Sequence, residues 1–421
     1  MVMVVVNICT MKRLIVKANR GACSLIFSFL LSGWAACFSE EPAIAPLQGP
    51  ATVILLPMQI GDKASLMLLN TMAERSVIDN AKREPGMKAM GTARVHDFAG
   101  NAQESPLFEI PSMKFRSREW ANVSAAMLDF HNFTIVTGVP IAGCLGVSEF
   151  RDSKLFIDYE VMKLTMHKGE SLLKGPKVQE LPLLPDTVVP SFKAVIDGVD
   201  VTFMVGTAQN NAISIETSVF DRFVEKGLIK KREGTGRSIS LSKDLRTSRG
   251  TFTSGELMGK TLKGLRVHSD GSSLLGVRWL AGFRTEIDFP GKMLRFVPVA
   301  HERKVALAEE MLAAILGYSN GHAAIIAIKP GGKGAMEIAG LQEKDEIFSL
   351  AGAEYLTWHV VLGMLEKNAG KRIKATYKRP GVEGIRETEI QLPDMITEWD
   401  TGLEATDTPP KSAPKNEARP K

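Results

Sequence analysis

Acidic residues at matched positions are the first side chains to consider for acid–base chemistry in this sequence. Two carboxylates held close together share one proton, so one can act as a general base and the other as a general acid. Asp158 and Asp288 each stand between an isoleucine and an aromatic residue, and Asp79 follows Val77 and Ile78. Because Asp158 and Asp288 recur symmetrically in strand-like segments, we expect each to make a turn hydrogen bond rather than to act in catalysis.

Other kinds of catalytic or binding chemistry have no matching motif in the sequence. The seven histidines are scattered, with no pair at metal-ligand spacing, so no metal site is predicted. There is no Gly-x-Ser-x-Gly elbow and no phosphate-binding loop, and no cofactor is expected. Cys144 lies in the apolar run 141–145, where a small buried residue is expected rather than a nucleophile.

The N-terminal residues 1–39 resemble an export signal. Basic residues between positions 12 and 20 precede an apolar run over 22–38, and Ser39 begins a polar stretch. Met11 is a second possible start, because Met-Lys-Arg is a more usual opening than the apolar residues before it. Three outcomes stay open: cleavage and secretion, lipidation at Cys37 in a box resembling that of bacterial lipoproteins, and an uncleaved membrane anchor. We therefore expect a protein of the periplasm or cell envelope.

The net charge of +5 gives no reason to expect a nucleic-acid partner. Much of the excess lies in the leader and in the lysine-bearing tail, and no block of basic residues alternates with aromatics. With 44% hydrophobic and 24% charged residues, the chain is typical of a globular protein with two or three domains. A Pro-rich connector is expected over 40–51, and a disordered tail over 394–421.

Between these ends the chain contains an internal repeat. The segments that recur are Leu145-Gly146-Val147, Ile157-Asp158-Tyr159 and Leu164, which return as Leu275-Gly276-Val277, Ile287-Asp288-Phe289 and Leu294. The offset is 130 throughout (275 minus 145, 288 minus 158). Each half also begins with apolar runs around a turn, Gly61-Asp62 and Asp197-Gly198, as in β-hairpins. Residues 94–103 are a candidate flap hairpin.

The order of these parts resembles the pepsin-like and retropepsin-like aspartic proteases in their two-lobed, single-chain form. The resemblance covers about residues 50–300 and implies a mainly β fold with two pseudo-symmetric β-barrel lobes, at 52–180 and 181–299. It implies that Thr71 and Thr207, at the centres of two matched turns, hydrogen-bond across the lobe interface. The alternative is that β propensity alone places a threonine in each strand.

The catalytic aspartates of that family are missing from both turns. Asn70 and Gly206 stand at their positions. An amide has no useful basicity and glycine has no side chain, so this pair cannot relay a proton. Met72 and Ala208 replace the family's following glycine, which allows close backbone approach. The resemblance therefore implies a protease scaffold without its acid pair.

Residues 315–393 resemble a PDZ domain of the bacterial protease-associated kind, after a predicted linker helix over 300–314. The segments that carry this resemblance are Pro330-Gly331 with Ala335, Ala339-Gly340-Leu341, and Asp345 with Ile347, followed by a predicted helix at 358–367 and strands at 372–377 and 387–392. It implies that Leu316, Gly317 and Tyr318 form a loop that captures a peptide's C-terminal carboxylate. The strand over 323–328, with Ala324 and Ile326, would pair with that peptide. The alternative is a module that packs on its neighbour and binds nothing.

These features together predict an exported, catalytically inactive aspartic-protease-like protein. Its expected partners are peptides or protein C-termini, bound in the interlobe cleft and the PDZ groove, with membrane association through an uncleaved leader or a lipidated Cys37. Two alternatives stay open. The chain could be an active endopeptidase that uses other acidic residues, or a structural scaffold of the envelope.

Overall fold

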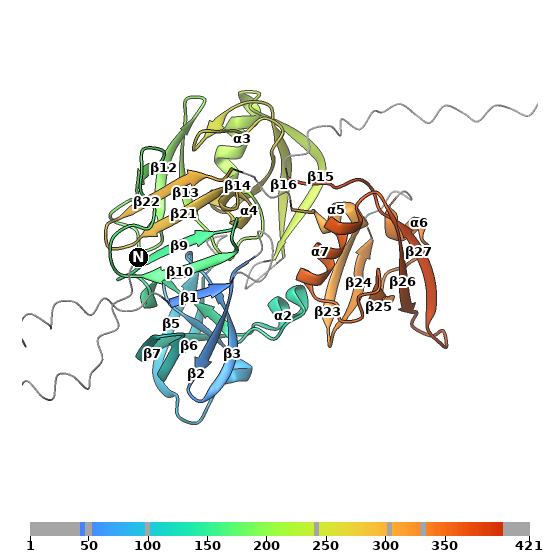
Figure 1. Cartoon of the computed structure of the whole chain (residues 1–421), viewed down its shortest axis with the longest axis horizontal. Coiled ribbons are helices and arrows are strands. Elements are labelled where there is room, and N and C mark those ends of the chain that lie inside the picture. The colour runs from blue at the N-terminus through green and yellow to red at the C-terminus, as the bar shows by residue number, and fades with distance from the viewer. Residues whose placement is uncertain are drawn as a thin grey trace, which may run out of the picture. The chain divides into compact units, whose positions relative to one another are not determined.

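A computed structural model describes residues 43–46, 53–96, 102–239, 244–300, 305–328 and 334–398, which form a mainly β protein (Figure 1). The expected export signal with Met11 and Cys37 lies outside the described residues, so export and lipidation stay predictions. Of the predicted disordered tail over 394–421, residues 399–421 also lie outside, whereas 394–398 are described and bond the rest of the chain through Leu307 N to Ile396 O and Arg266 N to Glu398 O. Within the described ranges, no helix combines the length and the apolar character that crossing a membrane requires.

The first half of the internal repeat forms a seven-stranded sheet, six strands of which close into a barrel. In spatial order the sheet contains β2 (Leu55–Ile60), β3 (Lys63–Leu69), β8 (Gly143–Leu145), β4 (Val77–Asp79), β7 (Arg118–Leu128), β6 (Ala102–Phe115) and β5 (Lys88–His96). A second pairing of β2 with β6, at Gln59 with Lys114 and Ile60 with Met113, closes the ring. The connections contain η3 (Asn80–Lys82), α2 (His131–Thr137) and η4 (Val147–Glu149).

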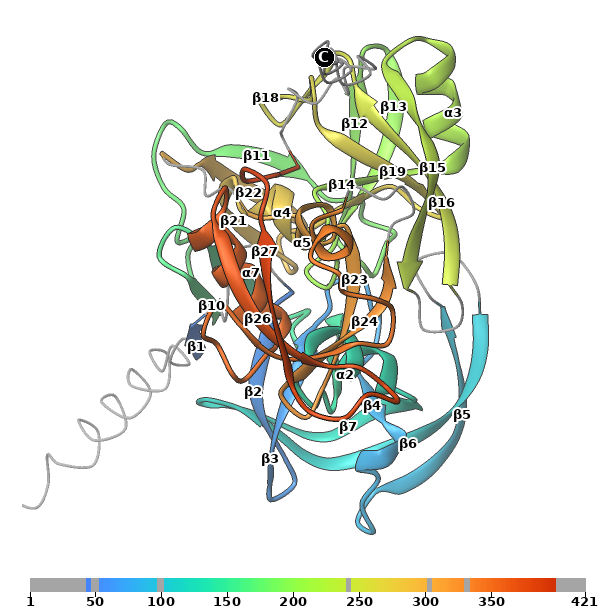
Figure 2. The same cartoon turned by 90° about the vertical axis from the view of Figure 1, so that its right-hand side faces the viewer.

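The second half forms another seven-stranded sheet with the same strand order. This sheet contains β12 (Ser191–Ile196), β13 (Val199–Val205), β20 (Leu274–Leu275), β14 (Ile213–Glu216), β19 (Arg266–Asp270), β16 (Asp244–Phe252) and β15 (Ile229–Ile239). Its connections contain α3 (Thr217–Glu225), the pair β17 (Glu256–Leu257) and β18 (Lys260–Thr261), and α4 (Val277–Leu280). Figure 2 shows α3 beside β15, which it contacts. The sequence repeat is thus a repeat of topology.

The hairpins expected from the sequence are present in both sheets. Gly61 and Asp62 join β2 to β3, and Asp197 and Gly198 join β12 to β13. Asp197 and Gly198 have φ values of 45° and 74°, as a type I′ turn requires. The expected flap corresponds to the paired strands β5 and β6, whose intervening residues 97–101 lie outside the described part.

Two glycines of the repeat are needed for the same steric reason. Gly146 and Gly276 have almost the same extended backbone, with φ −93° and −90°. A Cβ on Gly146 would lie 2.3 Å from the carbonyl carbon of Arg75, and one on Gly276 would lie 2.2 Å from the carbonyl oxygen of Asn211. Because another backbone segment approaches so closely, only glycine fits at either position.

A six-stranded antiparallel sheet combines strands of both halves. Its order is β1 (Ala43–Pro46), β10 (Lys163–His167), β9 (Lys154–Asp158), β21 (Phe283–Asp288), β22 (Met293–Pro298) and β11 (Gln179–Pro182). Strand β1 corrects one expectation, because residues 43–46 of the predicted Pro-rich connector pair with β10. Proline is compatible with this position, since β1 is an edge strand and Pro46 ends it.

The C-terminal residues form a separate five-stranded antiparallel sheet. Its order is β23 (Ala314–Ser319), β24 (His322–Ile328), β25 (Glu346–Leu350), β26 (Arg372–Lys378) and β27 (Arg386–Gln391), with α6 (Ala335–Ile338) and α7 (Trp358–Asn368) in the connections (Figure 1). The predicted helix at 358–367 and the strands beginning near 372 and 387 are present within a few residues of the expected bounds.

The predicted linker helix is shorter than expected. It is α5 (Ala308–Leu312), and residues 305–307 before it are not helical. The backbone there bonds elsewhere: Leu307 N donates to Ile396 O at 2.9 Å, and Ala306 N donates to Glu366 Oε1 at 3.5 Å. Ala313 ends the helix in a left-handed conformation. Contacts with α7 and with the residues that follow β27 therefore override the local helical pattern.

Strand alternation places the large hydrophobic core between the sheets. In β13, Val199, Val201, Phe203 and Val205 are buried, whereas Asp200 and Thr202 between them are exposed. One core cluster continues from the barrel through the six-stranded sheet into the second seven-stranded sheet. The C-terminal sheet has a core cluster of its own with α7.

Candidate functional site

The two turns singled out in the sequence meet where the seven-stranded sheets adjoin. Thr71 N donates to Thr207 Oγ1 and Thr207 N donates to Thr71 Oγ1, both at 3.1 Å. Thr207 Oγ1 donates to Leu69 O at 2.7 Å, and Thr71 Oγ1 donates to Val205 O at 2.5 Å. Both threonines are 0% exposed. The hydrogen bonds expected between them are present and reciprocal; we call this arrangement the threonine junction.

Asn70 and Gly206 occupy matched positions beside the threonine junction. Asn70 N donates to Leu145 O at 3.0 Å, and Gly206 N donates to Leu275 O at 2.8 Å. The Asn70 side chain is used locally, because its Oδ1 accepts from Met72 N at 3.0 Å. A Cβ on Gly206 would lie 2.8 Å from Met72 Sδ. Neither position thus offers a carboxylate: an amide stands at one, and the thioether of Met72 packs against the other.

Cys144 lies in β8 opposite Leu68 and is buried, as expected from its apolar run. Burial raises the pKa of the Cys144 thiol to about 12, against the smaller opposing effect of a hydrogen bond with the Asn70 side chain. The thiolate is the nucleophilic form of cysteine. At neutral pH this side chain is therefore an inert part of the core.

The three aspartates singled out in the sequence make turn or capping hydrogen bonds. Asp158 Oδ1 accepts from Glu160 N at 2.9 Å, and Asp288 Oδ1 accepts from Gly291 N at 2.8 Å. Asp79 Oδ1 accepts from Ala81 N at 3.2 Å at the start of η3. The expectation of structural roles for the symmetric pair agrees with these contacts.

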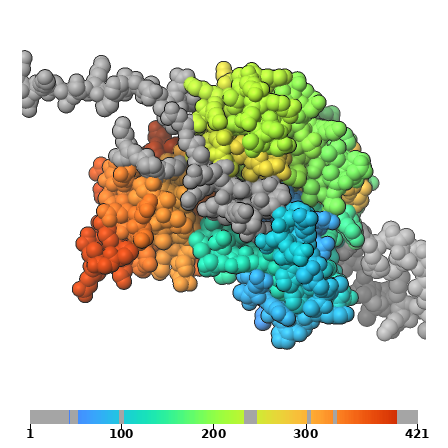
Figure 3. Space-filling view, turned by 180° about the vertical axis from the view of Figure 1, so that it is seen from behind, coloured from blue at the N-terminus to red at the C-terminus, as the bar shows by residue number. Residues whose placement is uncertain are grey.

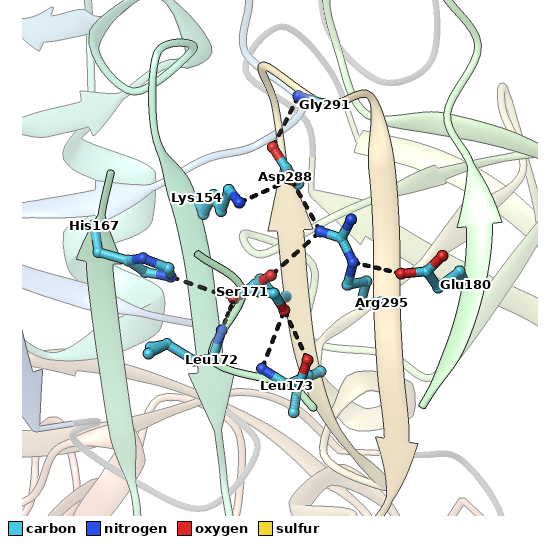
Figure 4. Close-up of polar contacts among 10 residues, drawn as sticks. Lys154, His167, Ser171, Leu172, Leu173, Glu180, Asp288, Gly291 and Arg295 are labelled. Carbon is cyan, nitrogen blue, oxygen red and sulfur yellow. Dashed lines mark hydrogen bonds and ion pairs between the residues drawn. The ribbon is translucent and has the colours of Figure 1, made fainter. Parts of the chain in front are cut away.

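Asp288 also belongs to a buried ion-pair network on the six-stranded sheet (Figure 4). Arg295 Nη1 lies 2.9 Å from Asp288 Oδ2 and 3.4 Å from Glu286 Oε1. Glu286 is 0% exposed, and its Oε2 accepts from Leu172 N at 2.8 Å and lies 3.3 Å from His167 Nε2. Burial alone would raise the pKa of Glu286, but its hydrogen bonds, that of His167 foremost, outweigh burial and hold the pKa below its ordinary value.

Metal-ligating residues are not grouped in the ranges that the structure covers. Among those residues, no cluster of three or more His, Cys, Asp or Glu side chains could hold a metal ion.

The structure changes the expected geometry of the C-terminal module. Leu316, Gly317 and Tyr318, expected in a loop, lie inside strand β23 and pair with β24. Ala324 and Ile326 lie in β24, which is flanked by β23 and β25. The edge strand next to β24 is therefore β23, and an added peptide strand would have to pair there. The expected loop is absent because Leu316, Gly317 and Tyr318 are themselves part of strand β23, rather than a loop before a strand.

Helix α2 of the first half packs against β23. A Cβ on Gly317 would lie 3.0 Å from Ile135 Cγ2 of α2. At the C-terminal end of α2, a Cβ on Gly138 would lie 2.8 Å from Tyr318 Cβ and 3.1 Å from Thr357 Cα, just before α7. Figure 3 shows the turquoise surface of the first half meeting the orange surface of the C-terminal sheet. The space between β23 and the start of α7 is thus covered by the chain's own helix.

Replacing Gly138 by alanine is expected to loosen the contact between α2 and β23. Gly138 has φ +74°, so a side chain there costs about 1–2 kcal/mol in backbone strain and also clashes with Tyr318. Gly227 has φ +72°, and no other residue lies within 4 Å of the place where its Cβ would stand, so Gly227→Ala carries the strain without the clash. Hydrogen exchange in β23 should rise in the Gly138 variant only; equal exchange in both variants would contradict the contact.

A cavity of about 320 Å³ adjoins the threonine junction. Leu68 and Ala208, neighbours of the two turns, line one side. Most of the remaining lining comes from α2, α5, β23 and the face of the second seven-stranded sheet formed by β15, β16 and β19. The other lining residues are Val53, 209–211, Arg278 of α4, Leu307, Trp358 of α7 and Glu398. Its volume lies in the range of small-ligand sites.

The arginines on the sheet side of this cavity were missed from the sequence. Arg232, Arg249 and Arg266 line it together with His268, and Arg278 of α4 lies deeper. A usable signal was the spacing of Arg266 and His268, since residues two apart in a strand share one face. The pairing of Arg232 with Arg249, and of Arg249 with His268, depends on strand register that no motif marks.

Comparison with protein-family models and with curated proteins found no match for this chain.

Proposed function

We propose that this chain is a non-catalytic relative of the two-lobed aspartic proteases that binds extended peptide segments in the cavity beside the threonine junction. The observation that carries the proposal is the junction itself. Two buried threonines exchange backbone and side-chain hydrogen bonds across a repeated topology, while Asn70 and Gly206 stand where an acid pair would be.

The repeated sheets support this proposal. Both halves place a strand, a threonine turn, and a parallel partner strand ending in Leu-Gly-Val in the same order. The six-stranded sheet adds three strands from each half around the β9–β21 pairing. Two lobes related in this way would give a shared cleft, and the cavity bounded by Leu68 and Ala208 is the part of it that a ligand could fill.

The C-terminal module is included in the proposal as a PDZ-like domain. Its edge strand β23 and its helix α7 supply the two walls that β-strand addition uses. Because α2 covers β23 here, a peptide strand would pair with β23 only after α2 moves away. We assign peptide binding primarily to the cavity, and propose that the export-type leader directs the protein to the periplasm or cell envelope.

Purified protein is expected to bind labelled unfolded peptides while leaving casein intact between about pH 3 and 7, because no acid pair can share a proton at the junction. Fluorescence anisotropy measures the binding, and an active aspartic protease run in parallel controls the cleavage assay. Pepstatin-sensitive cleavage would contradict the non-catalytic assignment.

Ala208→Trp, which fills the cavity beside the junction, is expected to weaken peptide binding by roughly tenfold or more. Ala89→Trp is the matched control, because Ala89 is exposed on β5 and does not line the cavity. Absence of saturable binding in the unaltered protein, or equal binding by the two variants, would argue against the cavity as the peptide site.

A further inference from the structure

The sheet wall of the cavity carries a row of basic side chains across neighbouring strands. Arg232 in β15 lies opposite Arg249 in β16, which lies opposite His268 in β19. Like charges directly opposite one another in a sheet are destabilising unless something of opposite charge faces them. Burial lowers the pKa of His268 to about 4, with Arg249 acting in the same direction, so the histidine is neutral at pH 7 and the arginines carry the charge.

Acidic residues lie at ion-pair distance from three of these arginines, and Arg278 Nη2 donates to Ala306 O at 3.3 Å, yet several of the guanidinium nitrogens make no hydrogen bond with a described residue. Glu310 lies 3.8 Å from Arg249 Nη1 and 3.9 Å from Arg266 Nη1, and Glu398 lies 3.6 Å from Arg278 Nη1. Each of these distances is longer than a hydrogen bond. Arg266 is 8% exposed and Arg278 is 6% exposed. Within the described part of the chain, no hydrogen-bond partner reaches Arg249 Nε, Arg266 Nη1, or Arg278 Nε and Nη1.

Buried guanidinium N–H groups without hydrogen-bond partners lower the stability of the fold. We therefore expect this cluster to bind a ligand that supplies an acceptor. The cavity is lined by as many arginines as acidic residues: Arg232, Arg249, Arg266 and Arg278 against Asp270, Glu309, Glu310 and Glu398. The lining therefore offers guanidinium donors without hydrogen-bond partners among the described residues but no large net charge, which suits one negative charge better than the two of a phosphate.

The remaining lining indicates what is attached to that charge. The wall opposite the sheet is apolar and includes Phe133 and Val136 of α2 and Leu316 of β23. Three further polar atoms of lining residues, Asn210 Oδ1, Asn211 Oδ1 and the Tyr318 hydroxyl, are buried and have no hydrogen-bond partner among the described residues. An unpartnered amide oxygen can accept a hydrogen bond from a ligand; an ionised fatty acid has no donor to offer, whereas a peptide backbone supplies N–H groups.

We propose that the cavity binds the C-terminal carboxylate of a peptide whose last side chain is apolar, with Arg266 and Arg278 as the carboxylate ligands. An arginine fork holds a carboxylate through two parallel N–H···O bonds, and the apolar wall receives the last side chain. This inference rests on the proposed peptide binding and specifies which end of the peptide the cavity selects.

The test compares a labelled hexapeptide ending in Val-Leu as the free acid and as the C-terminal amide, both titrated into the full chain. The free acid is expected to bind at least about tenfold more tightly than the amide, because only the acid meets the arginines. Arg266→Gln should remove this difference by weakening the acid and leaving the amide unchanged. Arg372→Gln, an exposed arginine of β26, is the control and should change neither.

Arg249→Gln is the second variant if Arg266→Gln does not fold, because Arg249 is 26% exposed in its side chain and tolerates replacement better. Arg249 lines the same wall, and its Nε has no hydrogen-bond partner among the described residues, so its loss should also reduce the preference for the acid over the amide. Equal affinity of acid and amide would overturn the carboxylate inference while leaving peptide binding intact. Binding of octanoate or inorganic phosphate that Arg266→Gln abolishes, with no peptide binding, would overturn the peptide C-terminus as ligand. Binding of no probe would reject both this inference and the proposed function.

Discussion

Replacing Glu286 by alanine is expected to lower the free energy of unfolding by about 3–5 kcal/mol, the usual cost of removing one partner from a buried ion pair. Glu286 is 0% exposed, and its carboxylate is held by Leu172 N, His167 Nε2 and Arg295 Nη1 (Figure 4). Without it, Arg295 loses a buried partner and Leu172 N loses its acceptor. Urea unfolding at pH 7 measures the loss.

Glu180→Ala is the matched control for this prediction. Glu180 also pairs with Arg295, through Nε at 2.6 Å, but its side chain is 52% exposed. Exposed ion pairs contribute only about 0.2–1 kcal/mol, since water screens both charges. Equal losses in the two variants would show that burial of Glu286 does not set the cost.

The pH dependence of a Glu286→Gln variant tests the sign of the effect. Because hydrogen bonds hold the pKa of folded Glu286 below its ordinary value of 4.5, the ionised form stabilises the fold above that pH. This stabilisation is lost as the pH falls below 4.5 and through the lower folded pKa. The difference in unfolding free energy between unaltered protein and Glu286→Gln should therefore shrink in that window, and a difference that grows on acidification would contradict the assignment.

The repeat was predictable from the sequence because its key positions accept only one or a few residue types in each half. Gly146 and Gly276 admit no side chain, and Asp158 and Asp288 each cap the turn after a closing strand. Each of these contacts is local or involves a neighbouring strand. The same residue type is therefore required at the matched position of both halves, and the sequence shows it. The Asp-Gly turn at 197–198 was predictable for the same reason, since only a few residue types adopt its backbone.

Features that depend on distant packing were not predictable. Strand β1 exists because β10 offers it a partner, and nothing in Ala43–Pro46 itself signals pairing. The placement of α2 on β23 depends on two glycines, Gly138 and Gly317, that lie far apart in sequence. The arginine wall likewise arises from register between β15, β16 and β19. The cavity, which carries the functional proposals, therefore became visible only in the structure.

The sequence left two explanations for the threonines of the junction: hydrogen bonding between the two halves, or β propensity alone. A substitution distinguishes them. Thr71→Val keeps the shape and the β propensity of the side chain but removes the hydroxyl, leaving Val205 O and Thr207 N without their partner. Buried backbone groups left unsatisfied cost about 1–3 kcal/mol each, so a loss of about 2–6 kcal/mol in the free energy of unfolding is expected for the two groups. Thr71→Ser retains the hydroxyl and should cost distinctly less.

Two further variants make this measurement specific to the junction. Thr202→Val makes the same chemical change at an exposed position of β13 and should be close to neutral. Thr71→Val combined with Thr207→Val should cost less than the sum of the single changes, because each hydroxyl depends on the other half's turn for its geometry. If Thr71→Val were as mild as Thr202→Val, strand propensity alone would account for the two threonines. A large and non-additive loss would instead show that the junction ties the two halves together, as the proposed non-catalytic scaffold requires.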